Sequence, residues 1–336
     1  MSRDLSTFPI SSSVRFKLCN SGFLTVEDLS NFKPNELAKE AGLSAEEALE
    51  VLDLVFPPVS SLSVTHSLGL SAFEVLKVEK SLNPITTSCT ALDRILKGGI
   101  PLKKVTEICG SPGSGKTQLC MQLCTNVQIP KSISGLSGEA FYIDTEGSFI
   151  VQRLVQIANG SINKYKAGLE GPDILEFSID KILQKVHYYS CKSYTEVIAQ
   201  INVLHKFLEQ HKNVSLIVVD SIAFHFRYGF DGSYSLRNRL LNGIMQSLVK
   251  IANDFNVAVV LTNQMTTKVK DDGTSQLIPA LGESWGHACT TRLLLSWTEN
   301  ERRAHILKSN ALEEAEAMFA ITTDGIRDVV LAQVQM

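Results

Sequence analysis

One eight-residue stretch, GSPGSGKT at residues 110–117, constrains the fold of this chain more than any other. The apolar run at 105–109 before it predicts a buried strand. Residues 118–124 after it carry apolar side chains three and four positions apart, which predicts a helix. Strand, glycine-rich turn and helix in this order are typical of a phosphate-binding P-loop, because glycines let the backbone wrap closely and aim its N–H groups at an anion. We therefore expect a site for a nucleoside triphosphate.

Two side chains of this stretch have expected roles. Lys116 should reach the β- and γ-phosphates, and the Thr117 hydroxyl should ligate Mg²⁺ at the start of a helix whose dipole favours anions. The predicted ATP-binding residues of this stretch are Gly110, Ser111, Pro112, Gly113, Ser114, Gly115, Lys116, Thr117 and Gln118.

From residue 85 onward, strand-like and helix-like segments alternate, which predicts an α/β fold with a sheet covered on both faces. Three β-rich runs each end in polar residues, at 138–146, 216–221 and 257–264. The carboxyl ends of parallel strands open onto one crevice, where ligands bind. We therefore expect these polar ends to meet near the P-loop.

Three side chains at these strand ends are candidates for ATP hydrolysis. Asp220 follows four apolar residues, which is typical of a Walker B aspartate that holds Mg²⁺. Glu146 can polarise the attacking water, although a strand-end acid equally suits capping of the next helix. Gln264 can read the γ-phosphate with its amide, or it can be a surface amide. Glu146, Gln264 and Lys116 form the predicted catalytic set.

Two segments that follow these strands are candidates for binding a nucleic acid. Residues 227–239 interleave cations with aromatic side chains, which suits phosphate contacts and base stacking. Residues 265–284 carry lysines among many Gly, Thr and Ser residues, and two solvated mobile loops are the alternative. His287 comes next and can sense phosphate across an interface or simply pack. The predicted DNA-binding cations are Arg227, Arg237, Arg239, Lys268 and Lys270.

The chain is predicted to divide into a helical N-terminal domain at 1–58, a linker at 59–84 and an ATPase core at 85–336. A capping box at 44–47 and prolines at 57–58 are among the signals that begin and end the short N-terminal helices. Glycine-containing turns between those helices suggest a helix-hairpin-helix-like domain. Residues 1–60 hold five Lys or Arg against nine Asp or Glu, so a protein-contact or spacer role is at least as well supported as DNA contact.

The predicted linker contains an apolar stretch, GLSAF at 69–73. Apolar residues in a linker need a surface to pack on, which can belong to this chain's core or to a neighbouring subunit. A self-packed helix is the other interpretation. Leu70, Ala72 and Phe73 are the predicted partner contacts.

Composition narrows the class of protein. Seven scattered cysteines form no disulfide framework and fit a reducing compartment; Cys120 and Cys124 suit buried packing better than metal binding. The net charge is only −3, so nucleic-acid contact must come from local patches. No apolar run approaches the ~18–20 residues of a bilayer span, and no signal pattern begins the chain. We expect no membrane association and a place in the nucleus or cytosol.

In order and spacing, four stretches of the chain resemble the RecA/RadA recombinase family: 110–117, 142–147, 216–220 and 261–264. Further stretches at 222–227, 237–243 and 280–288 are most similar to the C-type paralogue of the eukaryotic strand-exchange recombinase. The resemblance covers nearly the whole chain. It implies an α/β, RecA-type P-loop ATPase core with a mostly parallel central sheet, plus a small all-α, helix-hairpin-helix-like N-terminal domain.

The resemblance also implies a function. Such paralogues are DNA-dependent ATPases that act as mediators in homologous-recombination repair of double-strand breaks. They use ATP and Mg²⁺ at a subunit boundary. The implied partners are single-stranded and branched DNA, other recombinase paralogues in a hetero-oligomer, and the main strand-exchange recombinase. A nuclear location with some cytoplasmic pool is implied as well.

Residue by residue, the resemblance implies further roles. Arg153 would stack near the adenine, and His287 would sense nucleotide from a neighbouring subunit. Arg227 and Arg237 would fall in a first DNA loop, and Lys268 and Lys270 in a second.

One departure from the family pattern favours another function. The family's linker tag has an aromatic residue followed by Ala three positions later, and GLSAF lacks that order, which argues against ordinary self-polymerisation. The alternative is an ATP-gated assembly scaffold with slow or dispensable hydrolysis and little DNA contact. A ring helicase is less favoured because no strand-separating domain is evident, and a P-loop kinase because Gln264 and its two loops have no evident role there.

Overall fold

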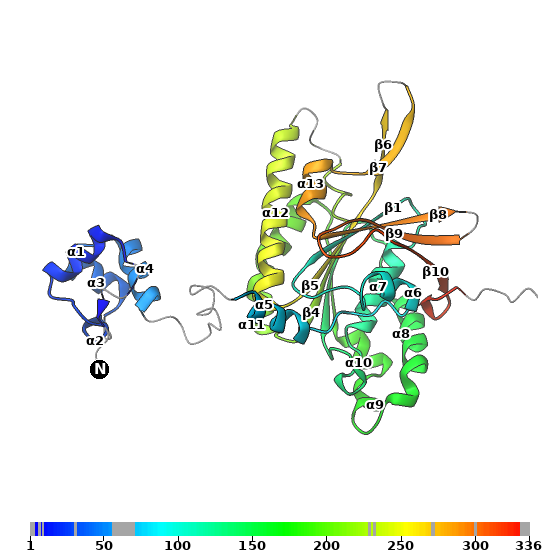
Figure 1. The fold of residues 1–336 in the computed structure, drawn as a ribbon, viewed down its shortest axis with the longest axis horizontal. Coiled ribbons are helices and arrows are strands. Elements are labelled where there is room, and N and C mark those ends of the chain that lie inside the picture. The colour runs from blue at the N-terminus through cyan, green and yellow to red at the C-terminus, as the bar shows by residue number, and fades with distance from the viewer. Residues whose placement is uncertain are drawn as a thin grey trace, which may run out of the picture. The chain divides into compact units, whose positions relative to one another are not determined.

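The computed structural model describes residues 4–5, 8, 10–29, 32–55, 71–227, 230, 233–269, 273–298 and 301–329. The chain divides into two compact units, Met1–Lys80 and Ser81–Met336. The first is built from short helices and the second from a sheet flanked by helices (Figure 1).

The helices of the first unit begin and end at local sequence signals. The predicted capping box forms at α4: Ser44 Oγ accepts a hydrogen bond from the Glu47 N–H (3.0 Å), and Glu47 Oε2 accepts one from the Ser44 N–H (2.8 Å). Gly42, at φ 63°, ends α3 in the left-handed conformation. The unit buries a small apolar core that includes Leu18, Leu29, Leu37 and Ala48. Its first four helices are α1 (Ser12–Asn20), α2 (Val26–Leu29), α3 (Pro34–Ala41) and α4 (Ala45–Val55).

Helix α5 (Ala72–Ser81) begins with the last two residues of the predicted apolar stretch at 69–73, Ala72 and Phe73. Ser71 and Glu74 cap its start through reciprocal hydrogen bonds, which explains why a helix forms here. The helix buries none of its residues, and Phe73 is 63% exposed. Leu70 lies outside the described residues. A helix therefore forms, but it is not packed, and the need for a partner surface stays a prediction.

Within the described residues of the second unit, nine strands form one sheet in the order β11-β10-β9-β8-β1-β5-β4-β2-β3. Neighbours from β8 through β1 to β3 run parallel, and β8 to β11 run antiparallel. This confirms the predicted mostly parallel α/β sheet. Its strands are β1 (Val105–Gly110), β2 (Glu139–Asp144), β3 (Val186–Ser190), β4 (Val214–Asp220), β5 (Ala258–Asn263), β8 (Thr291–Thr298), β9 (Glu301–Ser309), β10 (Glu316–Thr322) and β11 (Gly325–Arg327).

Helices cover both faces of this sheet (Figure 1). Alternate residues of β4 point to opposite faces of the sheet. Leu216 and Val218 pack into the apolar cluster that includes α7 and α8. Ile217 and Val219 pack into the apolar cluster that includes α11 and α12. A strand buried on both sides reads as a continuous apolar run, as residues 216–219 do. The helices are α6 (Thr90–Ile95), α7 (Lys116–Asn126), α8 (Val151–Tyr165), α9 (Asp173–Glu176), α10 (Ile179–Gln184), α11 (Tyr194–Gln210), α12 (Tyr234–Phe255) and α13 (Glu283–Ala288), with 3₁₀ turns at Lys131–Ile133 and Lys166–Gly168.

The two predicted DNA-binding segments are more regular than expected. Helix α12 already begins at Tyr234, so the placement of Arg237 in a loop was wrong, and Arg239 also lies on this helix. Buried apolar residues recur along α12 at helical spacing, and the helix extends from them toward its N-terminus. The second segment forms an antiparallel hairpin of β6 (Met265–Val269) and β7 (Ser275–Pro279), which projects from the sheet in Figure 1. Lys270 lies outside the described residues.

One expectation from composition is met by the two cysteines of α7. Cys120 and Cys124 are buried on α7, where burial raises the pKa of both thiols and keeps them in the neutral form. Of the helices in the described ranges, none has both the length and the apolarity of a membrane span.

Candidate nucleotide-binding site

The polar strand ends meet at one edge of the sheet, as predicted. In the strand register Asp144 lies beside Asp220, and Cys109 lies beside Asn263. The P-loop continues directly from β1, Glu146 follows β2 by two residues, and Gln264 follows β5. The P-loop, Asp220, Glu146 and Gln264 therefore share the crevice at the carboxyl ends of the parallel strands.

The P-loop brings a lysine ammonium close to its own backbone. Lys116 Nζ donates to the carbonyl oxygens of Gly110 (2.8 Å) and Ser111 (3.1 Å). Burial lowers the pKa of Lys116, and the nearby carboxylates of Asp220 and Glu146 oppose that shift. Those carboxylates therefore favour the charged ammonium, which is the form that binds phosphate.

Gly115 is required where the loop enters α7. It adopts φ 111°, and a Cβ atom there would lie 2.8 Å from Ile321 Cδ1. The close approach of β10 to the loop thus depends on glycine at this position.

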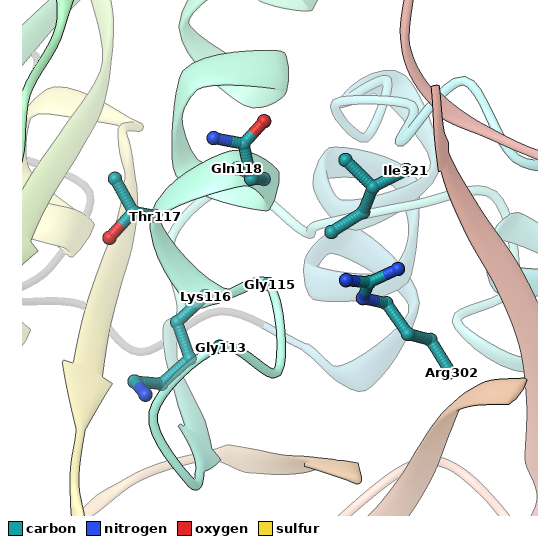
Figure 2. Close-up of a pocket in the computed structure, with 7 residues that line it drawn as sticks. All are labelled: Gly113, Gly115, Lys116, Thr117, Gln118, Arg302 and Ile321. Atoms are coloured by element: carbon teal, nitrogen blue, oxygen red, sulfur yellow. The ribbon is translucent and has the colours of Figure 1, made fainter. Parts of the chain in front are cut away.

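A pocket of about 360 Å³ opens beside the loop. In Figure 2, Arg302 of β9 and Ile321 of β10 lie across the loop from Thr117. The Arg302 guanidinium lies 3.9 Å from the centre of the Trp297 ring, and Trp297 Nε1 donates to the Gly113 carbonyl oxygen (3.4 Å). The lining residues are Gly113, Gly115, Lys116, Thr117, Gln118, Arg302 and Ile321.

Arg302 and Trp297 are missing from the sequence-based site. Trp297 lies on β8, 184 residues after Gly113 along the chain, Arg302 lies on β9, and no motif marks either residue. The buried Nε of Arg302 has no hydrogen-bond partner among the described residues. Because the side chain lines the pocket, this guanidinium is a second cation beside the loop.

Asp220 accepts hydrogen bonds from hydroxyl groups on three elements. Thr117 Oγ1 and Tyr142 OH both donate to Asp220 Oδ2 at 2.7 Å, and the Thr262 hydroxyl donates to Oδ1. Burial and the charge of Asp220 raise the pKa of Tyr142, so its hydroxyl stays a donor. Thr117 and Asp220 therefore lie together, as a Mg²⁺ site requires, and oxygen donors of these kinds suit that ion. Sequence reasoning gave Tyr142 and Thr262 no role, although both lie within the family-like stretches at 142–147 and 261–264.

Asp144, rather than Glu146, caps the turn after β2. Its Oδ1 accepts hydrogen bonds from the backbone N–H groups of Glu146 (3.1 Å), Gly147 (2.9 Å) and Ser148 (3.2 Å). The Glu146 side chain points elsewhere: its Oε1 accepts from Ser221 Oγ (2.5 Å) and from Gln264 Nε2 (2.7 Å). Two of the three predicted catalytic side chains, Glu146 and Gln264, are thus hydrogen-bonded to each other.

Both the nitrogen and the oxygen of the Gln264 amide form hydrogen bonds. While Nε2 donates to Glu146, Oε1 accepts from Arg227 Nη1 (2.6 Å). We call the series Ser221, Glu146, Gln264 and Arg227 the strand-end chain. It joins the ends of β2, β4 and β5 to the start of both predicted DNA-binding segments.

The buried carboxylate of Glu107 holds residues at this edge of the sheet in place. Glu107 of β1 accepts from Asn263 Nδ2 (2.7 Å) and Trp285 Nε1 (2.7 Å), and it pairs with Arg292. Burial lowers the pKa of Arg292, but Glu107 outweighs that effect and the net shift is upward. Because Asn263 precedes Gln264 and Trp285 lies on α13, these contacts fix the segment that follows β5.

Of the remaining predicted residues, Arg153 contacts the pocket residue Gln118. Arg153 donates to Gln118 Oε1 (2.7 Å) and to the carbonyl oxygens of Thr322 (2.6 Å) and Thr323 (2.7 Å), beside the pocket. His287 is exposed on α13, and Lys268 lies 3.8 Å from Glu283. Their roles toward adenine, a neighbouring nucleotide and DNA stay predictions.

Comparison with known proteins identifies the family. The Rad51 family model matches residues 79–329. The chain is 46% identical to DNA repair protein RAD51 homolog 3 of Cricetulus griseus, over 98% of this chain and 93% of that one. The homolog 3 protein of Dictyostelium discoideum is 42% identical over 78% of this chain and 70% of its own. DNA repair and recombination protein RadA of Aeropyrum pernix is 33% identical over 97% of both chains.

The substitution Lys116→Ala tests the site. It removes the ammonium aimed at phosphate and should weaken ATP binding by about 10- to 100-fold, the range for losing hydrogen bonds to a charged group. The dissociation constant for a fluorescent ATP analogue measures this. Lys131→Ala, at an exposed lysine of the same unit, is the control and should leave the constant unchanged. Equal affinity of the two variants would refute the assignment.

Proposed function

The chain belongs to the Rad51 family, and from this premise we propose that it is a recombinase paralogue that acts as a mediator in homologous-recombination repair of double-strand breaks. It binds ATP and Mg²⁺ at the P-loop and hydrolyses ATP at a boundary between subunits. The observation that carries the proposal is the strand-end chain, because it links the candidate base Glu146 to both candidate DNA-binding segments.

The residues at the strand ends divide the work of hydrolysis. Thr117 and Asp220 would hold Mg²⁺, which would neutralise charge on the phosphates. Lys116 binds the β- and γ-phosphates. Glu146 orients a water and accepts its proton as the water oxygen bonds to the γ-phosphorus and the bond to the bridging oxygen breaks. ADP and phosphate are the products.

Gln264 connects this reaction to the DNA segments. A γ-phosphate bound near Glu146 would offer acceptor oxygens to the same Gln264 amide, so the nucleotide state selects between its hydrogen bonds to Glu146 and to phosphate. Arg227 moves with the Gln264 Oε1 that it contacts. ATP binding then changes the start of both segments together.

The proposed nucleic-acid partners are single-stranded and branched DNA. Arg237 lies with its guanidinium 5.3 Å from the Tyr234 ring at the start of α12, a cation beside an aromatic face. The β6–β7 hairpin supplies Lys268. The proposed protein partners are other recombinase paralogues and the main recombinase, and the proposed location is the nucleus.

An ATP-gated scaffold is the second candidate function. It is favoured by α5, whose apolar side chains are exposed, with Val75 and Leu76 at 41% and 45% beside Phe73. Such a helix suits a protein partner more than DNA. In that case hydrolysis is slow or dispensable and DNA contact is weak.

The substitution Glu146→Gln separates binding from turnover. It should leave ATP affinity intact and lower the DNA-stimulated hydrolysis rate by about 100-fold or more, since a positioned base contributes about 10²–10⁴-fold. Phosphate release at saturating ATP measures the rate. Glu170→Gln, at an exposed glutamate, should hydrolyse ATP normally. If Glu146→Gln hydrolyses as fast as that control, the base lies elsewhere.

The substitution Arg237→Ala tests DNA contact. It should weaken binding to single-stranded DNA of any sequence and reduce the slope of log K against log salt by about 0.7, the effect of losing one phosphate contact. Fluorescence anisotropy at several salt concentrations measures this. Arg94→Ala, at an exposed arginine of α6, should keep the original slope. An unchanged slope in Arg237→Ala would favour the scaffold.

A further inference from the structure

Two histidines and a glutamate cluster at the end of the sheet away from the nucleotide crevice. Glu139 is the first residue of β2, His187 the second of β3, and His211 follows the last residue of α11. Asp144 ends β2 at the crevice, five residues after Glu139, which corresponds to about 16 Å along a strand. The cluster is therefore separate from the Mg²⁺ site at Thr117 and Asp220.

The three side chains converge. His187 Nε2 lies 2.8 Å from Glu139 Oε2, and the ring centres of His187 and His211 are 5.0 Å apart. One ligand atom from each residue lies within 4.8 Å of the other two. The Glu139–His187 hydrogen bond joins two members of the cluster but does not include His211.

The surrounding structure fixes the cluster. Phe207 contacts both imidazoles: its ring stacks on His211 at 4.1 Å and meets the His187 ring edge-on at 5.1 Å. The Glu139 N–H donates to the Asn213 carbonyl oxygen (2.9 Å), which holds the end of α11 against the start of β2. The ligand-bearing backbone positions are thus held by α11 and two strands.

The cluster is open enough to take an ion. The side chains of His187 and Glu139 are 21% and 18% exposed. Lys185, the cation just before β3, pairs with Glu176 at 2.9 Å and so does not neutralise Glu139. Tetrahedral zinc bonds of about 2.0–2.1 Å put ligand atoms about 3.4 Å apart, so partly exposed side chains need to close by only about 1.5 Å.

We propose that Glu139, His187 and His211 form a binding site for a divalent transition-metal ion, with Zn²⁺ as the best match. Two imidazole nitrogens and one carboxylate are a common protein ligand set for Zn²⁺, and water completes the tetrahedron. Mg²⁺ and Ca²⁺ prefer all-oxygen ligands, so this donor set selects against them. The bound ion joins β2, β3 and the end of α11, and it binds whether or not nucleotide is present.

The test is a Zn²⁺ titration of the full-length protein, stripped with a chelator, reduced and free of nucleotide, against a chromophoric competitor. The double variant His187→Gln/His211→Gln should bind one Zn²⁺ fewer per chain than the original protein. His205→Gln, at an exposed histidine of α11 that pairs with Glu209, is the matched control and should retain the site. Taking the difference between variants cancels Zn²⁺ held by cysteines.

A second variant guards against misfolding. Glu139→Gln keeps the shape of the side chain and should weaken Zn²⁺ by about tenfold or more, at least the loss seen when a ligand's support is removed. Zn²⁺ should also raise the melting temperature of the original protein and of His205→Gln but not of the double variant. ATP binding should be equal in all of them. Equal Zn²⁺ stoichiometry and affinity in the original protein and the double variant, or equal loss in His205→Gln, would overturn the proposal.

Discussion

The buried carboxylate of Asp220 is the group on which the nucleotide edge depends. A carboxylate removed from water costs several kcal/mol unless donors surround it. Here hydroxyls from α7, β2 and β5 converge on it, through Thr117, Tyr142 and Thr262. Satisfying this one charge therefore holds the P-loop helix and two neighbouring strands in a fixed relation, with Thr117 already beside the carboxylate that would share its metal ion.

Unlike the buried Asp220 carboxylate, the strand-end chain lies at the exposed rim of the same edge. Glu146 is exposed, and its hydrogen bonds to Ser221 and Gln264 are each worth about 1.5–3 kcal/mol at most. A γ-phosphate can compete with contacts of that size. A rigid part, centred on Asp220 and Glu107, thus supports a part that can rearrange. This division is what an ATP-controlled DNA-binding protein needs, since coupling requires an element with two arrangements of similar energy.

The sequence predicted features that depend on neighbouring residues better than features that depend on residues far apart in the chain. Contiguous signals succeeded: the strand, turn and helix around Gly115, the capping box at Ser44 and the buried run before Asp220. Tyr142 and Thr262 were missed because their hydrogen bonds to Asp220 join strands that are far apart in the chain. Asp144 was missed although its contacts with the N–H groups of residues 146–148 are local. Arg237 was predicted to lie in a loop but lies on α12. The start of this helix depends on how far it extends beyond its buried portion, and the spacing of cations and aromatic residues carries no information on that. The place of Arg302 beside the P-loop, and the cluster of Glu139 with the two histidines, likewise arise only when the sheet brings distant parts of the chain together.

The mass of the purified protein in solution with Mg²⁺ and a non-hydrolysable ATP analogue, with and without single-stranded DNA, tests the central claim most directly. A mediator whose linker tag departs from the filament pattern should remain a monomer or a small oligomer under every condition, and should grow into a defined complex only when a paralogue partner is added. Long assemblies formed by this chain alone on DNA would contradict the account, because they would make it a filament-forming strand-exchange enzyme.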